Sequence, residues 1–89
     1  MTINMIKKLQ NNDIETSSQI YAVFQLSYAV EAELLGANDF PPLKRPLESY
    51  LKSSNDFYGY LENNELAGVI ELEQTDKYID INSLVVKPK

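Results

Sequence analysis

Three acidic residues near the C-terminal end of the chain are the side chains best suited to acid–base chemistry. Asp80 lies on the last predicted strand, and Glu71 and Glu73 lie on the strand before it. A carboxylate, or a water molecule that it holds, can take a proton from a reacting group. The alternative is that all three residues belong to the solvent-exposed face of an amphipathic sheet. The sequence leaves both interpretations open.

Two absences limit the chemistry further. The chain contains no Cys and no His. Without Cys there is no disulfide framework, no thiolate zinc site and no Cys nucleophile. Without His there is no Ser–His catalysis, and the commonest metal ligand is missing. We therefore predict that the chain has no metal site and works without these two residue types.

Composition and charge bound the class of protein. The chain has 89 residues, of which 44% are hydrophobic and 24% charged, which is typical of one small globular domain. Eight basic and thirteen acidic residues give a net charge of −5, which argues against nucleic acid as a partner. No stretch is apolar for long enough to be a signal peptide or a membrane span. We expect a cytoplasmic protein that does not bind membranes.

The first half of the chain is predicted to form a strand and two helices. Residues 3–9 alternate loosely as a short strand, and Asp13 is suited to cap the helix that follows. No Gly or Pro interrupts that helix before Gly36, which fits a helix C-terminus. The polar residues 37–44 predict a loop, and Pro46 suits the first turn of a short helix that ends near Lys52. The core-facing stripe of the long helix is predicted to consist of Ile20, Val23, Phe24, Ser27, Val30 and Leu34.

The second half is predicted to form three consecutive strands, at residues 57–61, 66–73 and 78–86, the first two joined by a tight turn at Asn63-Asn64. On the middle strand, simple alternation places Leu66, Gly68, Ile70 and Leu72 on one face. The predicted fold class is α+β of the three-layer α/β type. Its sheet is mixed and largely antiparallel, and the order of elements is β-α-α-β-β-β.

This order of segments resembles the GNAT family of N-acetyltransferases. Residues 3–35 are similar to the first strand and first helix of that family, and residues 37–52 to its variable acceptor-side segment. The sequence FYGYLENNELAGVIELEQ, residues 57–74, is similar to the family's hairpin of strands 2 and 3. The sequence IDINSLVVKPK, residues 79–89, is similar to the fourth strand, with its L-x-V-x-P lead into the acetyl-CoA site.

The resemblance covers nearly all of the chain but only the first half of a typical domain of the family. The family's glycine-rich phosphate loop, [QR]-x-x-G-x-[GA], would begin directly after Lys89. The resemblance therefore implies an incomplete N-acetyltransferase domain: a recombinant fragment, a proteolytic product or the product of a split gene. We expect such a fragment to bind acetyl-CoA weakly or not at all, because convergent backbone N–H groups for the pyrophosphate are missing.

In the family, the fourth strand bulges and separates from its neighbour, and its freed backbone groups bind the pantetheine arm of acetyl-CoA. The resemblance assigns this cofactor-binding role to Leu84, Val85 and Val86. An unpaired strand edge is a suitable template for an extended ligand that carries amides. The alternative is that Leu84 and Val86 are ordinary core residues, and both can hold because the ligand uses the backbone.

Substrate binding is predicted at Asn38, Asp39 and Phe40, since the corresponding loop often lines the acceptor pocket in the family. The base that deprotonates the acceptor amine is unknown. Asp80, Glu71 and Glu73 are the candidates, and Asn82 is a weaker one that would hold a water molecule.

Two functions are compatible with these observations. The first is the N-terminal portion of an enzyme that transfers an acetyl group from acetyl-CoA to a small-molecule or peptide amine, inactive as the isolated fragment. The second is a small non-catalytic α+β interaction domain. In both cases we expect a homo-oligomer, because the last strand is apolar and nothing in the sequence covers its edge.

Overall fold

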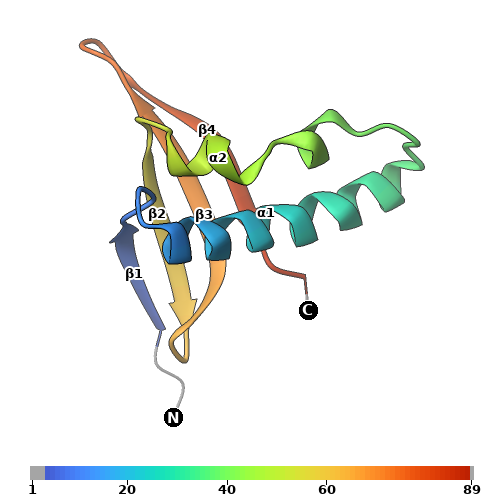
Figure 1. Cartoon of the computed structure of the whole chain (residues 1–89), viewed down its shortest axis with the longest axis horizontal. Coiled ribbons are helices and arrows are strands. Elements are labelled where there is room, and N and C mark those ends of the chain that lie inside the picture. The colour runs from blue at the N-terminus through green and yellow to red at the C-terminus, as the bar shows by residue number, and fades with distance from the viewer. Residues whose placement is uncertain (1–3, 89) are drawn as a thin grey trace.

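The computed structural model describes residues 4–88, so the predicted strand residue Ile3 and the basic residue Lys89 lie outside it. Its elements follow the predicted order (Figure 1). The strands are β1 (Asn4–Leu9), β2 (Asp56–Glu62), β3 (Glu65–Gln74) and β4 (Ile79–Val86), and the helices are α1 (Ile14–Leu35) and α2 (Leu47–Leu51). A short 3₁₀-helix, η1 (Pro41–Lys44), occupies part of the predicted loop.

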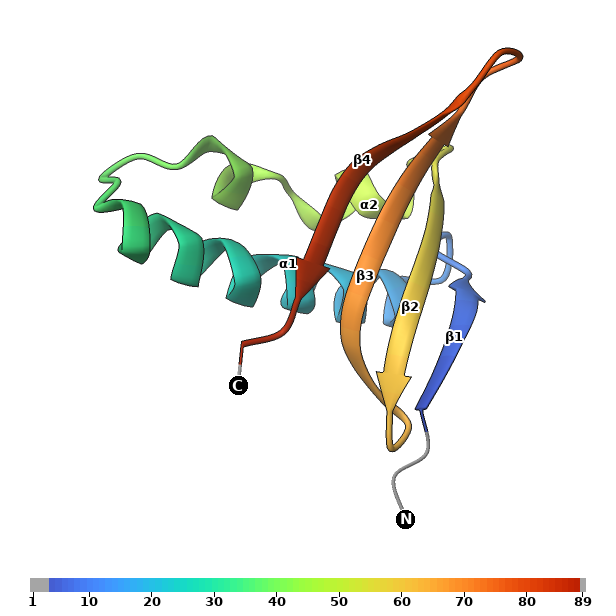
Figure 2. The same ribbon diagram turned by 180° about the vertical axis from the view of Figure 1, so that it is seen from behind.

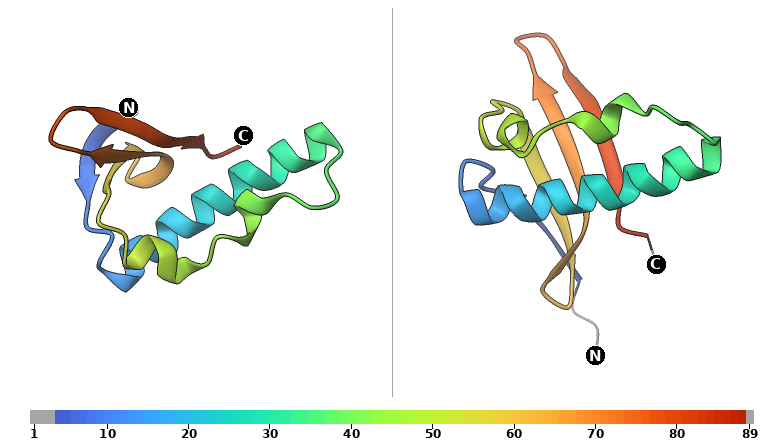
Figure 3. Two further views of the ribbon diagram at one scale, coloured as in Figure 1. Left: turned by 90° about the horizontal axis from the view of Figure 1, so that it is seen from above. Right: turned by 45° about the vertical axis from the view of Figure 1, so that its right-hand side comes forward.

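The four strands form one sheet in the order β1-β2-β3-β4, and every neighbouring pair is antiparallel. The α+β class is thus confirmed, but the expectation of a mixed sheet is wrong. The chain crosses the sheet along α1 and returns through η1 and α2, so that β2 enters beside β1 in the opposite direction (Figure 1). The described elements form two layers rather than three, because both helices lie on the same face of the sheet (Figure 3).

Helix α1 begins and ends as its sequence predicts. The Asp13 side chain accepts a hydrogen bond from the Thr16 backbone N–H, and Gly36 adopts the left-handed conformation with φ 65°. A capping carboxylate satisfies an otherwise unpaired N–H, and Gly adopts positive φ without steric cost. These two caps fix the length of the helix.

Most buried residues of α1 lie in its first half, and Ala32 is the one buried residue in its second half. Ile20, Val23 and Phe24 are buried, as predicted, but Val30 is 39% and Leu34 80% exposed. The reason is that α1 continues past β4, the last strand, so its second half has no sheet beneath it (Figures 1 and 2). The prediction of a core stripe along the whole helix is therefore wrong for Val30 and Leu34.

The β2–β3 hairpin turns at Asn63 and Asn64, which have φ of 52° and 69°. Two positive φ values are the geometry of the tight turn predicted there. Just after the turn the pairing shifts, from Leu61 opposite Leu66 to Tyr60 opposite Gly68, which leaves Ala67 as an extra residue. This bulge rotates Leu66 onto the helix side, where it packs against the core, so the simple alternation predicted for β3 fails at Leu66.

The core lies between α1, α2 and the helix-facing side of the sheet. Aromatic residues dominate its centre: the ring centroids of Phe24 and Tyr50 are 4.8 Å apart, and those of Tyr50 and Phe57 are 6.2 Å apart. Such tilted pairs contribute about 1 kcal/mol each beyond simple burial. The buried hydrophobic cluster consists of Leu9, Ile20, Val23, Phe24, Tyr50, Phe57, Val69 and Val85.

Within residues 4–88, neither helix has the length and apolar composition needed to cross a membrane.

Candidate functional site

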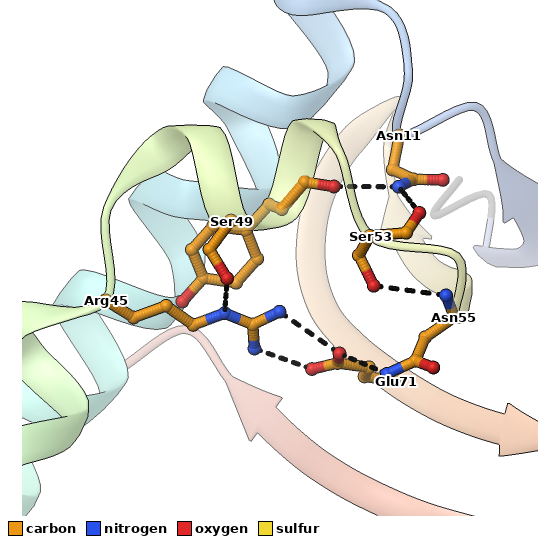
Figure 4. Close-up of polar contacts among 7 residues, drawn as sticks. Asn11, Arg45, Ser49, Ser53, Asn55 and Glu71 are labelled. Carbon is orange, nitrogen blue, oxygen red and sulfur yellow. Dashed lines mark hydrogen bonds and ion pairs between the residues drawn. The ribbon is translucent and has the colours of Figure 1, made fainter.

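A buried ion pair joins the helical layer to the sheet. Two guanidinium nitrogens of Arg45, between η1 and α2, donate hydrogen bonds of 2.7 and 3.1 Å to the two carboxylate oxygens of Glu71 on β3 (Figure 4). The Glu71 side chain is 3% exposed and that of Arg45 is 25% exposed. A bidentate arrangement of this kind is among the strongest and most directional contacts between side chains.

Neighbouring groups complete the hydrogen bonding of this pair. Asn55 donates from its side-chain amide to Glu71 at 2.9 Å, and Arg45 donates from Nε to the Ser49 hydroxyl at 2.9 Å (Figure 4). The guanidinium carbon of Arg45 also lies 3.9 Å from the centroid of the Tyr50 ring, which adds a cation–π contact. Arg45 is thereby held on three sides.

The environment shifts the ionisation of both partners toward their charged forms. Burial alone would raise the pKa of Glu71, but the hydrogen bonds from Arg45 and Asn55 and the charge of Arg45 outweigh it, and the pKa lies below its usual value. Burial alone would lower the pKa of Arg45, yet the Glu71 carboxylate more than compensates and raises it. Both groups are therefore charged at neutral pH.

Tyr50 carries the one buried side-chain oxygen or nitrogen, among the described residues, that has no hydrogen-bond partner. Burial raises the pKa of its phenol, so the group stays neutral. The ring packs between Phe24, Phe57 and the Arg45 guanidinium. Tyr50 is thus a core residue, and its buried hydroxyl is not accessible to a substrate.

These contacts decide between the two interpretations of Glu71. The solvent-exposed interpretation is wrong for this residue, which is buried because α2 and Arg45 cover its part of β3. Its carboxylate oxygens are already bonded to Arg45 and Asn55, and its lowered pKa makes it a poor proton acceptor. Glu71 therefore has a structural role as the buried partner of Arg45. Asp80 and Glu73 are the better candidates for a base.

Asp80 and Glu73 lie directly opposite each other on β4 and β3, and both are exposed. Strand alternation puts them on the same side of the sheet as Glu71, near the β3–β4 turn. Both carboxylates are open to solvent and to a ligand that approaches this end of β4. Their exposure agrees with the solvent-face interpretation, and a catalytic role for either residue stays a prediction.

Strand β4 is bulged and has a free edge. Glu71 pairs with Ser83 but Leu72 pairs with Ile81, so Asn82 is an extra residue in the β3–β4 ladder. The Lys87 backbone N–H donates to the Ala67 carbonyl of β3 at 2.7 Å. Because successive N–H groups of a strand point to opposite sides, those of Leu84 and Val86 point away from β3. No described strand pairs with β4 on that side.

The side chains of the three residues predicted to bind a cofactor lie on different faces of the sheet. The Val85 side chain is buried in the core, whereas those of Leu84 and Val86 are 68% and 63% exposed on the other face of the sheet. The core interpretation, which named Leu84 and Val86, is therefore wrong for both, since no described element covers that face; the core residue of this segment is Val85. The backbone of Leu84 and Val86 is available at the free edge.

The loop predicted to bind substrate is far in sequence from Glu73 on β3 and Asp80 on β4, and it follows the end of α1 that extends past the sheet (Figures 1 and 2). Asp39 forms an exposed ion pair with Lys44 at 2.7 Å, and the Phe40 ring packs 6.1 Å from that of Tyr28. Asn38 is exposed. The ring contact holds the loop to α1, the ion pair joins it to η1, and neither contact involves Asp80 or Glu73.

Arg45, Ser49 and Asn55 are the site residues that sequence reasoning missed. The only signal was a single Arg in a chain whose other basic residues are Lys, placed in a loop before a Pro. In residues 4–88, no three acidic side chains gather closely enough to hold a metal ion.

Comparison with known proteins gives a partial match to a longer protein. The chain is 34% identical over 84 residues to the UPF0157 protein YqkA of Bacillus subtilis (strain 168). The match covers 94% of this chain but 24% of YqkA, so the chain spans about a quarter of the length of that relative. No protein-family model and no solved structure matches the chain significantly.

Proposed function

We propose that the chain is the N-terminal portion of an acetyl-CoA-dependent N-acetyltransferase of the GNAT type. The observation that carries the proposal is the free edge of β4 at Leu84 and Val86, two residues that the sequence resemblance assigns to the cofactor, which follow a bulge at Asn82. A bulged edge strand presents N–H and C=O groups that the ladder does not use. The pantetheine arm has two amides that can bond to such groups.

The remaining parts of the enzyme would come from further polypeptide. The match to YqkA leaves about three-quarters of that protein outside the aligned region, which is room for a phosphate-binding loop and further strands. In the complete enzyme, the amine would attack the thioester carbonyl, and the thiolate of CoA would leave. Asp80 or Glu73, or a water molecule that one of them holds, would accept the proton from the amine. Because the family's phosphate loop would begin only after Lys89, we expect the isolated chain to catalyse no measurable transfer.

NMR spectroscopy of the isotope-labelled chain tests the assignment of β4. Pantetheine is the probe, because it carries the amides of the cofactor without the phosphates for which the chain has no site. We expect weak binding that shifts the amide signals of Leu84 and Val86, while the amide of Ile6 on the opposite edge strand stays unchanged. Shifts spread equally over β1 and β4, or no shifts at millimolar pantetheine, would contradict the proposal.

A further inference from the structure

The face of the sheet that points away from the helices is not covered by any described helix (Figure 2), and it exposes several apolar side chains. Ile6 on β1 is 74% exposed, and Ile81, Leu84 and Val86 on β4 are each more than 60% exposed. Strand pairing sets Tyr58 and Tyr60 of β2 between them, opposite Ile70 and Gly68 of β3. We refer to this set of residues as the outer face.

A shallow hollow of about 300 Å³ lies at the middle of the outer face. Gly68 forms part of its floor, and Ile6, Tyr60, Ile70, Leu84 and Val86 are among the residues that surround it. The surrounding side chains project while Gly68 has none, so the surface has both protrusions and a recess. Two copies of such a surface can interlock, as side chains of packed sheets do.

The charged groups of the outer face lie at its margin, and two of them, Glu62 and Glu65, are acidic residues opposite each other beside the β2–β3 turn. Lys8 and Asp56 form an ion pair of 3.3 Å at one side, and Glu62 lies at the end of β2. The centre of the outer face therefore carries no charged side chain, and its negative charges are at one end. A two-fold interface brings each patch near its own copy, so a surface without unbalanced charge at its centre avoids self-repulsion.

The area of the outer face is sufficient for a dimer. Four strands about 4.8 Å apart and eight residues long at about 3.3 Å per residue give a projected area of about 500 Å². Two copies would then bury about 1,000 Å² or more in total, which reaches the lower limit for a specific interface. We propose that the outer face is the contact surface between two copies of this chain, with the two sheets packed face to face about a two-fold axis.

This arrangement differs from pairing through the free edge of β4. Helix α1 and the loop that follows it extend past β4 on the helix side (Figures 1 and 3). In an antiparallel edge-to-edge pair, both copies have their helices on the same side, so α1 of one copy would meet the helices of the other. The outer face carries no described helix and lets a second copy approach. The proposed dimer contact uses the side chains of the outer face, whereas the proposed cofactor contact uses the backbone at the free edge of β4.

Light scattering coupled to size-exclusion chromatography, over a concentration series from low to high micromolar, tests the dimer. We expect the mass to rise from monomer toward dimer. Ile6→Glu places a charge on the outer face, on the strand farthest from β4, and is expected to leave a monomer. The matched control is Leu34→Glu, because Leu34 is 80% exposed on the extended part of α1 and outside the outer face. This variant is expected to dimerise like the parent chain.

A parent chain that stays monomeric throughout the series would overturn the proposal, as would a dimer that Ile6→Glu leaves intact. Circular dichroism of both variants checks that they are folded. If Ile6→Glu is unfolded, Tyr60→Lys on the adjacent strand replaces it, with the same expected loss of the dimer.

Discussion

At the level of single residues, the Arg45–Glu71 pair is the feature that the sequence did not predict. Alternation along β3 indicated which residues share the face of Glu71, but not that this face would be covered by Arg45, 26 residues earlier in the chain. A contact between a loop and a strand leaves no periodic pattern, whereas the caps at Asp13 and Gly36 are local and were predicted. What the sequence does predict at this scale is therefore limited to interactions between near neighbours.

Arg45→Met is expected to lower the free energy of unfolding by about 3 kcal/mol, because it leaves the Glu71 carboxylate buried without a counter-charge. Lys44→Met is the matched control, one residue away, since it breaks an exposed ion pair worth at most about 1 kcal/mol. Urea unfolding followed by circular dichroism measures both. Equal losses in the two variants would show that the buried pair contributes no more than a surface pair.

Glu71 also predicts how stability depends on pH. Its pKa in the folded state lies below the ordinary value of 4.5, so its stabilising contribution is present above that pH and is lost as the pH falls through the folded pKa. Between about pH 6 and about pH 3, the parent chain should therefore lose more stability than Glu71→Gln. All other carboxylates are the same in both proteins, so their contributions to the pH dependence of stability cancel in the comparison. Identical slopes in urea unfolding at these pH values would contradict the lowered pKa.

At the level of elements, the sequence predicted the strands and helices and their order, because each has a periodic pattern with recognisable ends. It did not predict which part of α1 would be buried, since the helix is longer than the four-stranded sheet is wide. Helices of 22 residues extend about 33 Å, whereas four strands span about 14 Å from the first axis to the last. Simple alternation also could not predict the bulges at Ala67 and Asn82, because a bulge depends on how a strand pairs with its neighbour.

The length mismatch predicts different responses from two residues of the same helical stripe. Phe24→Ala should cost about 3–5 kcal/mol, because the Phe24 ring is fully buried against Tyr50 and its removal leaves a cavity. Val30→Ala should change stability by less than about 1 kcal/mol, since the Val30 side chain is 39% exposed. Thermal and urea unfolding compare them. A large loss for Val30→Ala would mean that something packs against the extended part of the helix.

At the level of the whole molecule, the described residues leave two surfaces of the sheet uncovered. The first is the free edge of β4. The part of α1 that extends past β4 lies on the helix side of this edge (Figures 1 and 2). The second is the outer face. The sequence predicted an apolar last strand without cover, but it did not separate these two surfaces, to which we assign different partners in our proposals: an extended ligand at the edge and a second copy of the sheet on the face. That distinction depends on where α1 ends relative to the sheet.

Acetyl-CoA binding tests the proposed function most directly, because it does not require the acceptor amine to be known. The protein is the complete open reading frame that contains these residues, and the method is titration calorimetry. We predict one site per chain. Leu84→Pro removes the N–H that faces the free edge and should weaken binding at least about tenfold, whereas Leu84→Ala keeps that N–H and should bind like the parent. No binding by the parent protein, or equal affinity of the Pro and Ala variants, would contradict the assignment of β4 as the cofactor strand.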